Sequence, residues 1–98
     1  MQAKQLYRQR IIVSDQAFSE SVIWALPAPL AGSTHSFKYR LAYVFAGVCV
    51  LRFDNEAGKG DHCHIDGVES AYTFTTPAQL MADFFDNIQR WNHEHSHA

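Results

Sequence analysis

The sequence has few cysteines and prolines and no long apolar run. Its two cysteines, Cys49 and Cys63, cannot form the disulfide framework that stabilises small secreted domains. No stretch reaches the roughly 20 apolar residues that cross a bilayer. The charged N-terminal residues 1–10 precede no apolar block and no cleavage site, which argues against a signal peptide. We therefore expect a cytoplasmic protein without a membrane segment, in which both cysteines are small core residues.

A large excess of charge is also absent. The formal net charge is −2, so the chain does not coat nucleic acid by charge alone. The charges are unevenly distributed, because residues 1–64 hold seven Lys or Arg against five Asp or Glu, whereas residues 65–98 hold only Arg90 against five acids. The first part can attract an anion, and the second part repels an anion or meets a basic partner.

Alternation of apolar and polar residues predicts six β-strands. They cover residues 4–13, 18–26, 37–45, 48–55, 61–65 and 68–74. Asp66-Gly67 is a strong signal for a two-residue hairpin turn, and Ala46-Gly47 is a weaker one. In the second segment Phe18, Val22 and Trp24 share one face, together with Leu26. The pattern predicts a meander of antiparallel strands.

A helix is predicted after the last strand. Thr76 is a good N-cap, Pro77 suits the first helical position, and Gln79 is placed to complete a capping box. An apolar stripe at helical spacing follows, formed by Leu80, Met81, Phe84, Phe85, Ile88 and Trp91. The predicted fold is α+β, an antiparallel β-meander of about six strands packed against one C-terminal α-helix, in a single domain over residues 1–98.

The two turns fix an expected register for each hairpin. A two-residue turn at 46–47 pairs Tyr39 with Asp54, and it also pairs Lys38 with Asn55, Arg40 with Phe53 and Leu41 with Arg52. The turn at 66–67 pairs His64 with Glu69 and His62 with Ala71. His62, His64 and Glu69 then share one face, and the opposite face looks like core and carries Cys63, Ile65, Val68, Tyr72 and Phe74.

The stretch from Lys38 to His64 is dense in polar side chains. They are Lys38, Tyr39, Arg40, Arg52, Asp54, Asn55, Lys59, Asp61, His62 and His64. Two histidines at i and i+2 on a strand project side by side, and one imidazole can act as base while the other acts as acid near neutral pH. Nearby cations suit a phosphate, and Asp54 or Glu69 can orient an imidazole. Such groups would serve metal-free RNA cleavage.

Other interpretations of these residues stay open. A hairpin that carries His, Lys and Asp is also simply a solvated face. The run Asp61-His62-Cys63-His64 offers ligands for Zn²⁺ or a softer ion, but the pleat turns Cys63 away from both histidines. His93, His95 and His97 lie in a polar terminal tail where helices fray, and we expect no more than adventitious metal capture there.

Three segments together resemble the TumE family of toxin–antitoxin toxins. They are Phe-Lys-Tyr-Arg-Leu at 37–41, Arg-Phe-Asp-Asn-Glu at 52–56 and Gly-Lys-Gly-Asp-His-Cys-His-Ile at 58–65. The positions that match the family pattern are Lys38, Tyr39, Asp54, Asn55, Lys59, Asp61, His62 and His64. The resemblance implies a cytosolic toxin that is paired with a small helix-turn-helix antitoxin and acts as a ribonuclease. We expect no cofactor.

We therefore predict a metal-independent endoribonuclease. The predicted catalytic residues are His62 and His64 as the base and acid, with Tyr39, Asp54 and Asp61 beside them. The predicted substrate-binding residues are Lys38, Arg40, Arg52, Asn55 and Lys59. The alternative is a non-catalytic module whose sheet edge or acidic helix docks a regulatory chain, and the third choice is a metal-binding protein. The sequence leaves open whether the protein is a monomer or a homodimer.

Overall fold

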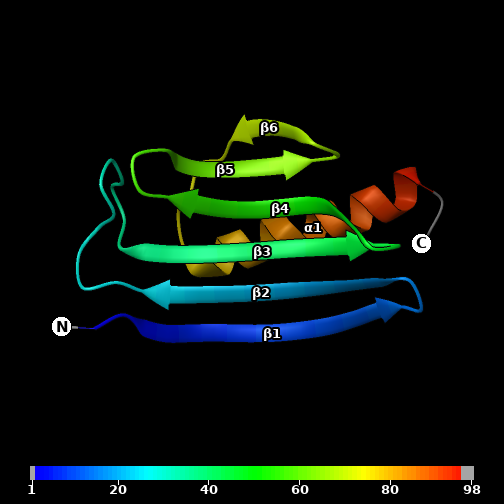
Figure 1. Ribbon diagram of the computed structural model, residues 1–98, viewed down its shortest axis with the longest axis horizontal. Coiled ribbons are helices and arrows are strands. Elements are labelled where there is room, and N and C mark those ends of the chain that lie inside the picture. The colour runs from blue at the N-terminus through cyan, green and yellow to red at the C-terminus, as the bar shows by residue number, and fades with distance from the viewer. Residues whose placement is uncertain (1, 96–98) are drawn as a thin grey trace.

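The computed structural model describes residues 2–95. Six strands and one helix follow one another along the chain: β1 (Lys4–Ser14), β2 (Ala17–Ala25), β3 (Phe37–Phe45), β4 (Val48–Glu56), β5 (Gly60–Ile65), β6 (Val68–Ala71) and α1 (Pro77–Glu94). The strands form one antiparallel sheet in sequence order, and α1 lies across one face of it (Figure 1). The predicted α+β meander is confirmed. Within the described residues, α1 is not long and apolar enough to cross a membrane.

The core lies between the central strands and α1. On β3 the buried residues Tyr39, Leu41 and Tyr43 lie two positions apart and so share the face under α1, as the period of two in a strand requires. The helix contributes Leu80, Phe84, Ile88 and Trp91, which are all buried, and each large buried side chain stabilises the fold by about 1.5–3 kcal/mol. Edge-to-face ring contacts join the two layers, with centroids 5.9 Å apart in both Tyr43–Trp91 and Phe53–Phe84.

The helix begins at the predicted N-cap. The Thr76 hydroxyl accepts a hydrogen bond from the Gln79 backbone N–H at 3.1 Å, and Pro77 occupies the first turn. The second half of the predicted capping box is wrong. The Gln79 side chain donates to Asp83 Oδ1 at 2.8 Å instead of reaching back to Thr76, because an i+4 carboxylate offers a charged acceptor.

Both predicted hairpin turns are confirmed. Ala46 and Gly47 have φ values of 50° and 80°, and Asp66 and Gly67 have φ values of 50° and 83°. Two successive positive φ angles define the type I′ turn, whose twist matches that of paired strands. Asp66 tolerates this left-handed conformation better than Ala46 does, which explains why the second turn was the stronger sequence signal.

The predicted register of the β3–β4 hairpin is wrong. Val44 pairs with Cys49 but Tyr43 pairs with Leu51, so a β-bulge at Val50 shifts the remaining pairs by one residue. Tyr39 therefore does not face Asp54, which pairs with Arg40; likewise the pairs Lys38–Asn55, Arg40–Phe53 and Leu41–Arg52 do not form, since Leu41 pairs with Phe53 and Ala42 with Arg52.

The bulge has a physical reason. Strict alternation from Val48 would place Arg52 and Asp54 on the face that α1 covers. One extra residue reverses the alternation, so that Leu51 and Phe53 become buried there and the charged pair moves to the other face. Without this bulge two charged groups would be buried in the core at a large cost.

Some of the predicted core positions are exposed. Ile65 and Val68 are 37% and 70% exposed, because β6 is a four-residue edge strand whose residues are all exposed. Cys49 is also exposed, contrary to expectation, whereas Cys63 is buried as predicted. Burial raises the pKa of the Cys63 thiol, so this group stays protonated at neutral pH.

Candidate functional site

Two rows of side chains cross the face of the sheet that α1 leaves uncovered, which we call the open face. Directly paired residues on neighbouring strands project to the same side, so the pairings trace each row through all six strands. The first row is Arg8, Val22, Arg40, Asp54, His62 and Ala71, and the second is Arg10, Glu20, Ala42, Arg52, His64 and Glu69. Five of the ten predicted site residues meet in these rows, namely Arg40, Arg52, Asp54, His62 and His64.

His64 lies between a cation and a carboxylate. Its Nε2 atom is 3.0 Å from Arg52 Nη2 and 3.2 Å from Glu69 Oε1. When Nε2 carries no proton it can accept an N–H from Arg52, and when it carries one it can donate to Glu69. Both protonation states of this imidazole thus have a partner already in place, which suits a group that transfers protons.

His62 stands beside His64 on β5 and is half-buried. Its register partner on β4 is Asp54. Among residues 2–95 the imidazole of His62 has no hydrogen-bond partner. The two histidine Cα atoms are about 7 Å apart along the strand, so both rings can reach one bound phosphodiester.

Arg52 connects the two rows. Its Nε atom is 3.1 Å from Asp54 Oδ2, yet that buried N–H is not aimed at any acceptor in the described residues. The contact is therefore an ion pair without hydrogen-bond geometry. Asp54 contacts Arg52 rather than an imidazole, so its role on this face is to hold the guanidinium next to His64.

Three of the other predicted site residues lie on the covered face or its margin, namely Tyr39, Asn55 and Asp61. Asp61 Oδ2 accepts a hydrogen bond from the Tyr39 hydroxyl at 2.6 Å and lies 2.8 Å from Nε2 of His35. Burial, followed by the hydrogen bond to Asp61, raises the pKa of Tyr39 far above its ordinary value. The Tyr39 hydroxyl is therefore unsuited to give up its proton near neutral pH.

Asn55 is fully buried and bridges two strands. Its Oδ1 atom accepts the Tyr39 backbone N–H at 3.0 Å, and its Nδ2 atom donates to the Phe37 carbonyl at 2.7 Å. The side chain thus satisfies main-chain groups of β3 and has no free polar atom of the kind that a substrate contact needs.

The two predicted lysine ligands are also engaged. The Lys38 ammonium donates to the main-chain carbonyl of Asn55. Lys59 lies in the exposed turn between β4 and β5, 3.7 Å from Glu56. An exposed pair of this kind contributes little stability, so Lys59 can swing toward a ligand more easily than Lys38.

His35 was not predicted from the sequence. Its Nδ1 atom accepts the Phe37 backbone N–H at 3.2 Å, so Nε2 carries the proton of the neutral ring and donates to Asp61. The ring also stacks on Phe74 at 4.0 Å. With both nitrogens occupied, His35 clamps the loop before β3 to β5 and does not offer a free base.

Arg8 and Arg10 were also missed, although a sequence signal existed. They alternate on β1 at i and i+2, the spacing that places two side chains on one face of a strand.

No three His, Cys, Asp or Glu side chains are grouped to hold a metal ion within residues 2–95. Cys63 does face away from His62 and His64, as predicted. His93 belongs to α1 rather than to a frayed tail. His95 is the C-cap residue: its backbone N–H donates to the Trp91 carbonyl at 3.0 Å, and its ring stacks on Trp91 at 3.9 Å. His97 lies outside the described residues.

The fold and the open face define a class: a small single-sheet α+β protein with an uncovered face rich in histidine and arginine. A family model described as Toxin TumE matches residues 2–92, and the chain belongs to this toxin family. This confirms the resemblance seen in the sequence. Membership indicates a toxin and suggests an antitoxin partner. Searches of curated proteins and of solved structures found no match.

Proposed function

We propose that the protein is the toxin of a toxin–antitoxin pair and acts as a metal-independent endoribonuclease in the cytoplasm, held inactive by a small helix-turn-helix antitoxin. One observation carries the proposal: the unpartnered imidazole of His62 stands beside His64, whose Nε2 atom lies between Arg52 and Glu69. General acid–base catalysis needs two such groups within reach of one substrate.

The reaction assigns one proton to each imidazole. His62 removes the proton of a ribose 2′-hydroxyl, and that oxygen attacks the adjacent phosphorus. The bond from phosphorus to the 5′-oxygen breaks, and His64 donates a proton to this leaving oxygen. The products are a 2′,3′-cyclic phosphate and a 5′-hydroxyl. The assignment of His64 as acid is supported by Glu69, which can hold the Nε2 proton until it is transferred.

Arg52 supplies positive charge where the transition state becomes more negative, whereas Arg40 lies two strands from His62, about 10 Å, where it can bind the adjoining phosphate. Arg52 contacts His64 and Asp54, so its position is fixed before the substrate arrives. A fixed donor costs no reorganisation during the reaction, which makes it more effective than a mobile one. Lys59, in its exposed turn, is the proposed third phosphate ligand.

The test uses His62→Ala and His64→Ala, with His93→Ala on α1 as the matched control. Each purified protein is incubated with RNA in the presence of a chelator, and each gene is induced in a bacterial host with and without the antitoxin. We expect the first two variants to lose about 10²–10⁴-fold in cleavage rate and to lose toxicity, with RNA 5′-hydroxyl ends appearing only for wild type and His93→Ala. A His62→Ala protein that stays fully toxic and fully nucleolytic would contradict the assignment.

A second candidate is a non-catalytic module that binds a regulatory chain by strand addition. One observation favours it: β1 is an edge strand of 11 residues on which Leu6 and Ile12 are 48% and 68% exposed. Such an edge is a template for another strand. The acidic helix is a weaker docking site, since Asp83 binds Tyr72 and Gln79. This candidate predicts no RNA cleavage by the wild type and more damage from Ile12→Asp on the β1 edge than from His62→Ala. Docking on the helix would instead make charge reversal at Asp83 or Asp86 the more damaging change.

A further inference from the structure

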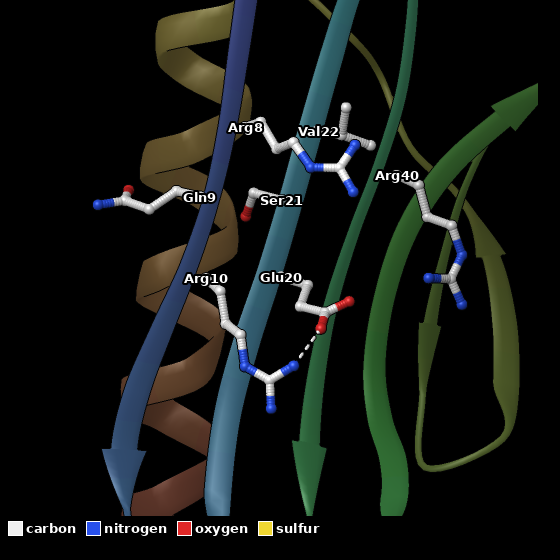
Figure 2. A pocket seen from close by; sticks show the side chains of 7 residues that line it. All are labelled: Arg8, Gln9, Arg10, Glu20, Ser21, Val22 and Arg40. Atoms are coloured by element: carbon white, nitrogen blue, oxygen red, sulfur yellow. Dashed lines mark hydrogen bonds and ion pairs between the residues drawn. The ribbon is translucent and has the colours of Figure 1, made fainter.

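A concavity of about 410 Å³ lies over β1, β2 and β3, away from the histidines. Figure 2 shows the side chains around it, with Arg8, Arg10 and Glu20 in front of the strands and α1 behind them. Its lining consists of Arg8, Gln9, Arg10, Glu20, Ser21, Val22 and Arg40. Three guanidinium groups and one carboxylate give the lining a net positive charge.

The three arginines differ in how they are held. Arg10 is paired with Glu20 at 2.7 Å and lies over the Phe18 ring at 4.1 Å. Arg8 and Arg40 have no ion pair or side-chain hydrogen bond with any of residues 2–95. They flank Val22 in the first row. Their donors are therefore free for a ligand.

The two unpaired arginines suit an anion. Arg8 and Arg40 are both exposed and lie two strands apart, about 10 Å, so their like charges repel each other only weakly through water. A phosphate between them would relieve the repulsion, because guanidinium groups bind phosphate through paired N–H donors.

We infer that this concavity is a phosphate-binding subsite for single-stranded RNA, which holds the backbone a few nucleotides away from the cleaved bond. The first row continues from Arg40 through Asp54 to His62, so one extended strand of RNA can lie along it. Trp24 is only half-buried on the same face of β2 and offers a ring on which a base can stack. The link to a cleaved bond rests on the proposed function, whereas binding does not.

Binding is measured first. The probe is a fluorescent ten-nucleotide RNA in which every 2′-hydroxyl is methylated, so that it cannot be cleaved by attack of that oxygen. We expect Arg8→Gln to weaken binding about tenfold and Arg8→Gln/Arg40→Gln to weaken it further. The slope of log affinity against log salt should fall by about 0.7 for each lost contact.

The matched control is Arg90→Gln, which removes an arginine from α1, where Arg90 pairs with Asp86. Its RNA affinity should equal that of wild type. Equal weakening by Arg90→Gln and Arg8→Gln, or no weakening by the double variant with its melting temperature preserved, would overturn the subsite. A ten-residue Asp/Glu-rich peptide is tested as well. If wild type binds the peptide more tightly than the RNA, and the double variant no longer binds the peptide, then the concavity binds an acidic protein chain and the RNA subsite is overturned.

Cleavage kinetics separate the subsite from the catalytic proposal. A dinucleoside monophosphate is too short to reach from His62 to Arg8, so Arg8→Gln should cleave it as fast as wild type does. A ten-nucleotide RNA should show a raised KM and an unchanged kcat with the same variant. If wild type binds the methylated RNA through Arg8 but cleaves nothing, the proposed function fails and the subsite stands. A lower kcat on the short substrate would show that Arg8 acts in the chemistry, which overturns its role as a distant subsite.

Discussion

The two faces of the sheet differ in how completely the hydrogen-bonding groups of their polar side chains are satisfied. On the covered face and its margin, Asn55, Asp61 and His35 each have two or more hydrogen-bond partners, most of them on other segments of the chain. On the open face, the side chains of His62 and Arg8 have no hydrogen-bond partner among residues 2–95, and the Nε–H group of Arg52 has no acceptor there. Buried polar groups must be satisfied for the chain to fold. Groups left unsatisfied where water can enter are available for a substrate. The comparison predicts that the covered face governs stability and that the open face governs activity.

The largest expected effect is a loss of RNA cleavage with little change in the free energy of unfolding. His62→Ala/His64→Ala should reduce RNA cleavage to background, a loss of at least the 10²–10⁴-fold expected for one acid or base. The free energy of unfolding should fall by no more than about 1 kcal/mol, because His62 has no side-chain partner in the described residues and His64 loses one hydrogen bond with Arg52 and one pair with the exposed Glu69. Urea denaturation, followed by circular dichroism, measures the second quantity. A large drop in stability would remove the distinction between the two faces.

The opposite effect is expected from Asn55→Ala. The substitution removes two hydrogen bonds and leaves the Tyr39 N–H and the Phe37 carbonyl buried without partners. We expect a loss of about 2–4 kcal/mol in the free energy of unfolding. Asn87→Ala is the matched control, since the Asn87 side chain donates a single hydrogen bond to the Asp83 carbonyl and should cost about 1 kcal/mol. Equal losses for the two variants would contradict the bridging role of Asn55.

Much of this contrast could be predicted from the sequence, because local signals decide it. The period of two over β3, the Asp66-Gly67 turn and the stripe on α1 each act within a few residues. They predicted the meander, the covered core and the shared face of His62 and His64.

The sequence could not show which face Arg52 and Asp54 occupy. Their placement depends on the bulge at Val50, which is favoured because it buries Leu51 and Phe53 on the face that α1 covers. No residue type marks it. The role of His35 could not be predicted for a similar reason. Its partner Asp61 lies 26 positions along the chain, and no residue pattern near His35 indicates this contact.

The smallest expected effect concerns Tyr39, and it depends on pH. The pKa of this hydroxyl is raised in the folded protein, first by burial and then by its hydrogen bond to Asp61. Above the ordinary tyrosine pKa of about 10, the unfolded chain therefore releases the proton while the folded chain keeps it. The unfolded state then binds fewer protons, so the free energy of unfolding falls as pH rises. Below pH 10 this contribution is fully present.

Tyr39→Phe removes the titrating group together with its hydrogen bond. At pH 7 it should cost about 1–2 kcal/mol, because Asp61 loses one of its two donors. Between pH 10 and pH 11 the loss of stability with pH should be shallower than in wild type, so the two curves converge. Tyr43→Phe is the control, since Tyr43 also donates to a side chain, Asn92, at 2.7 Å. If the free energy of unfolding of Tyr39→Phe falls with pH as steeply as that of wild type through this range, then the pKa of Tyr39 is not raised in the folded protein. The hydrogen bond between Tyr39 and Asp61 would then not be maintained on the covered face.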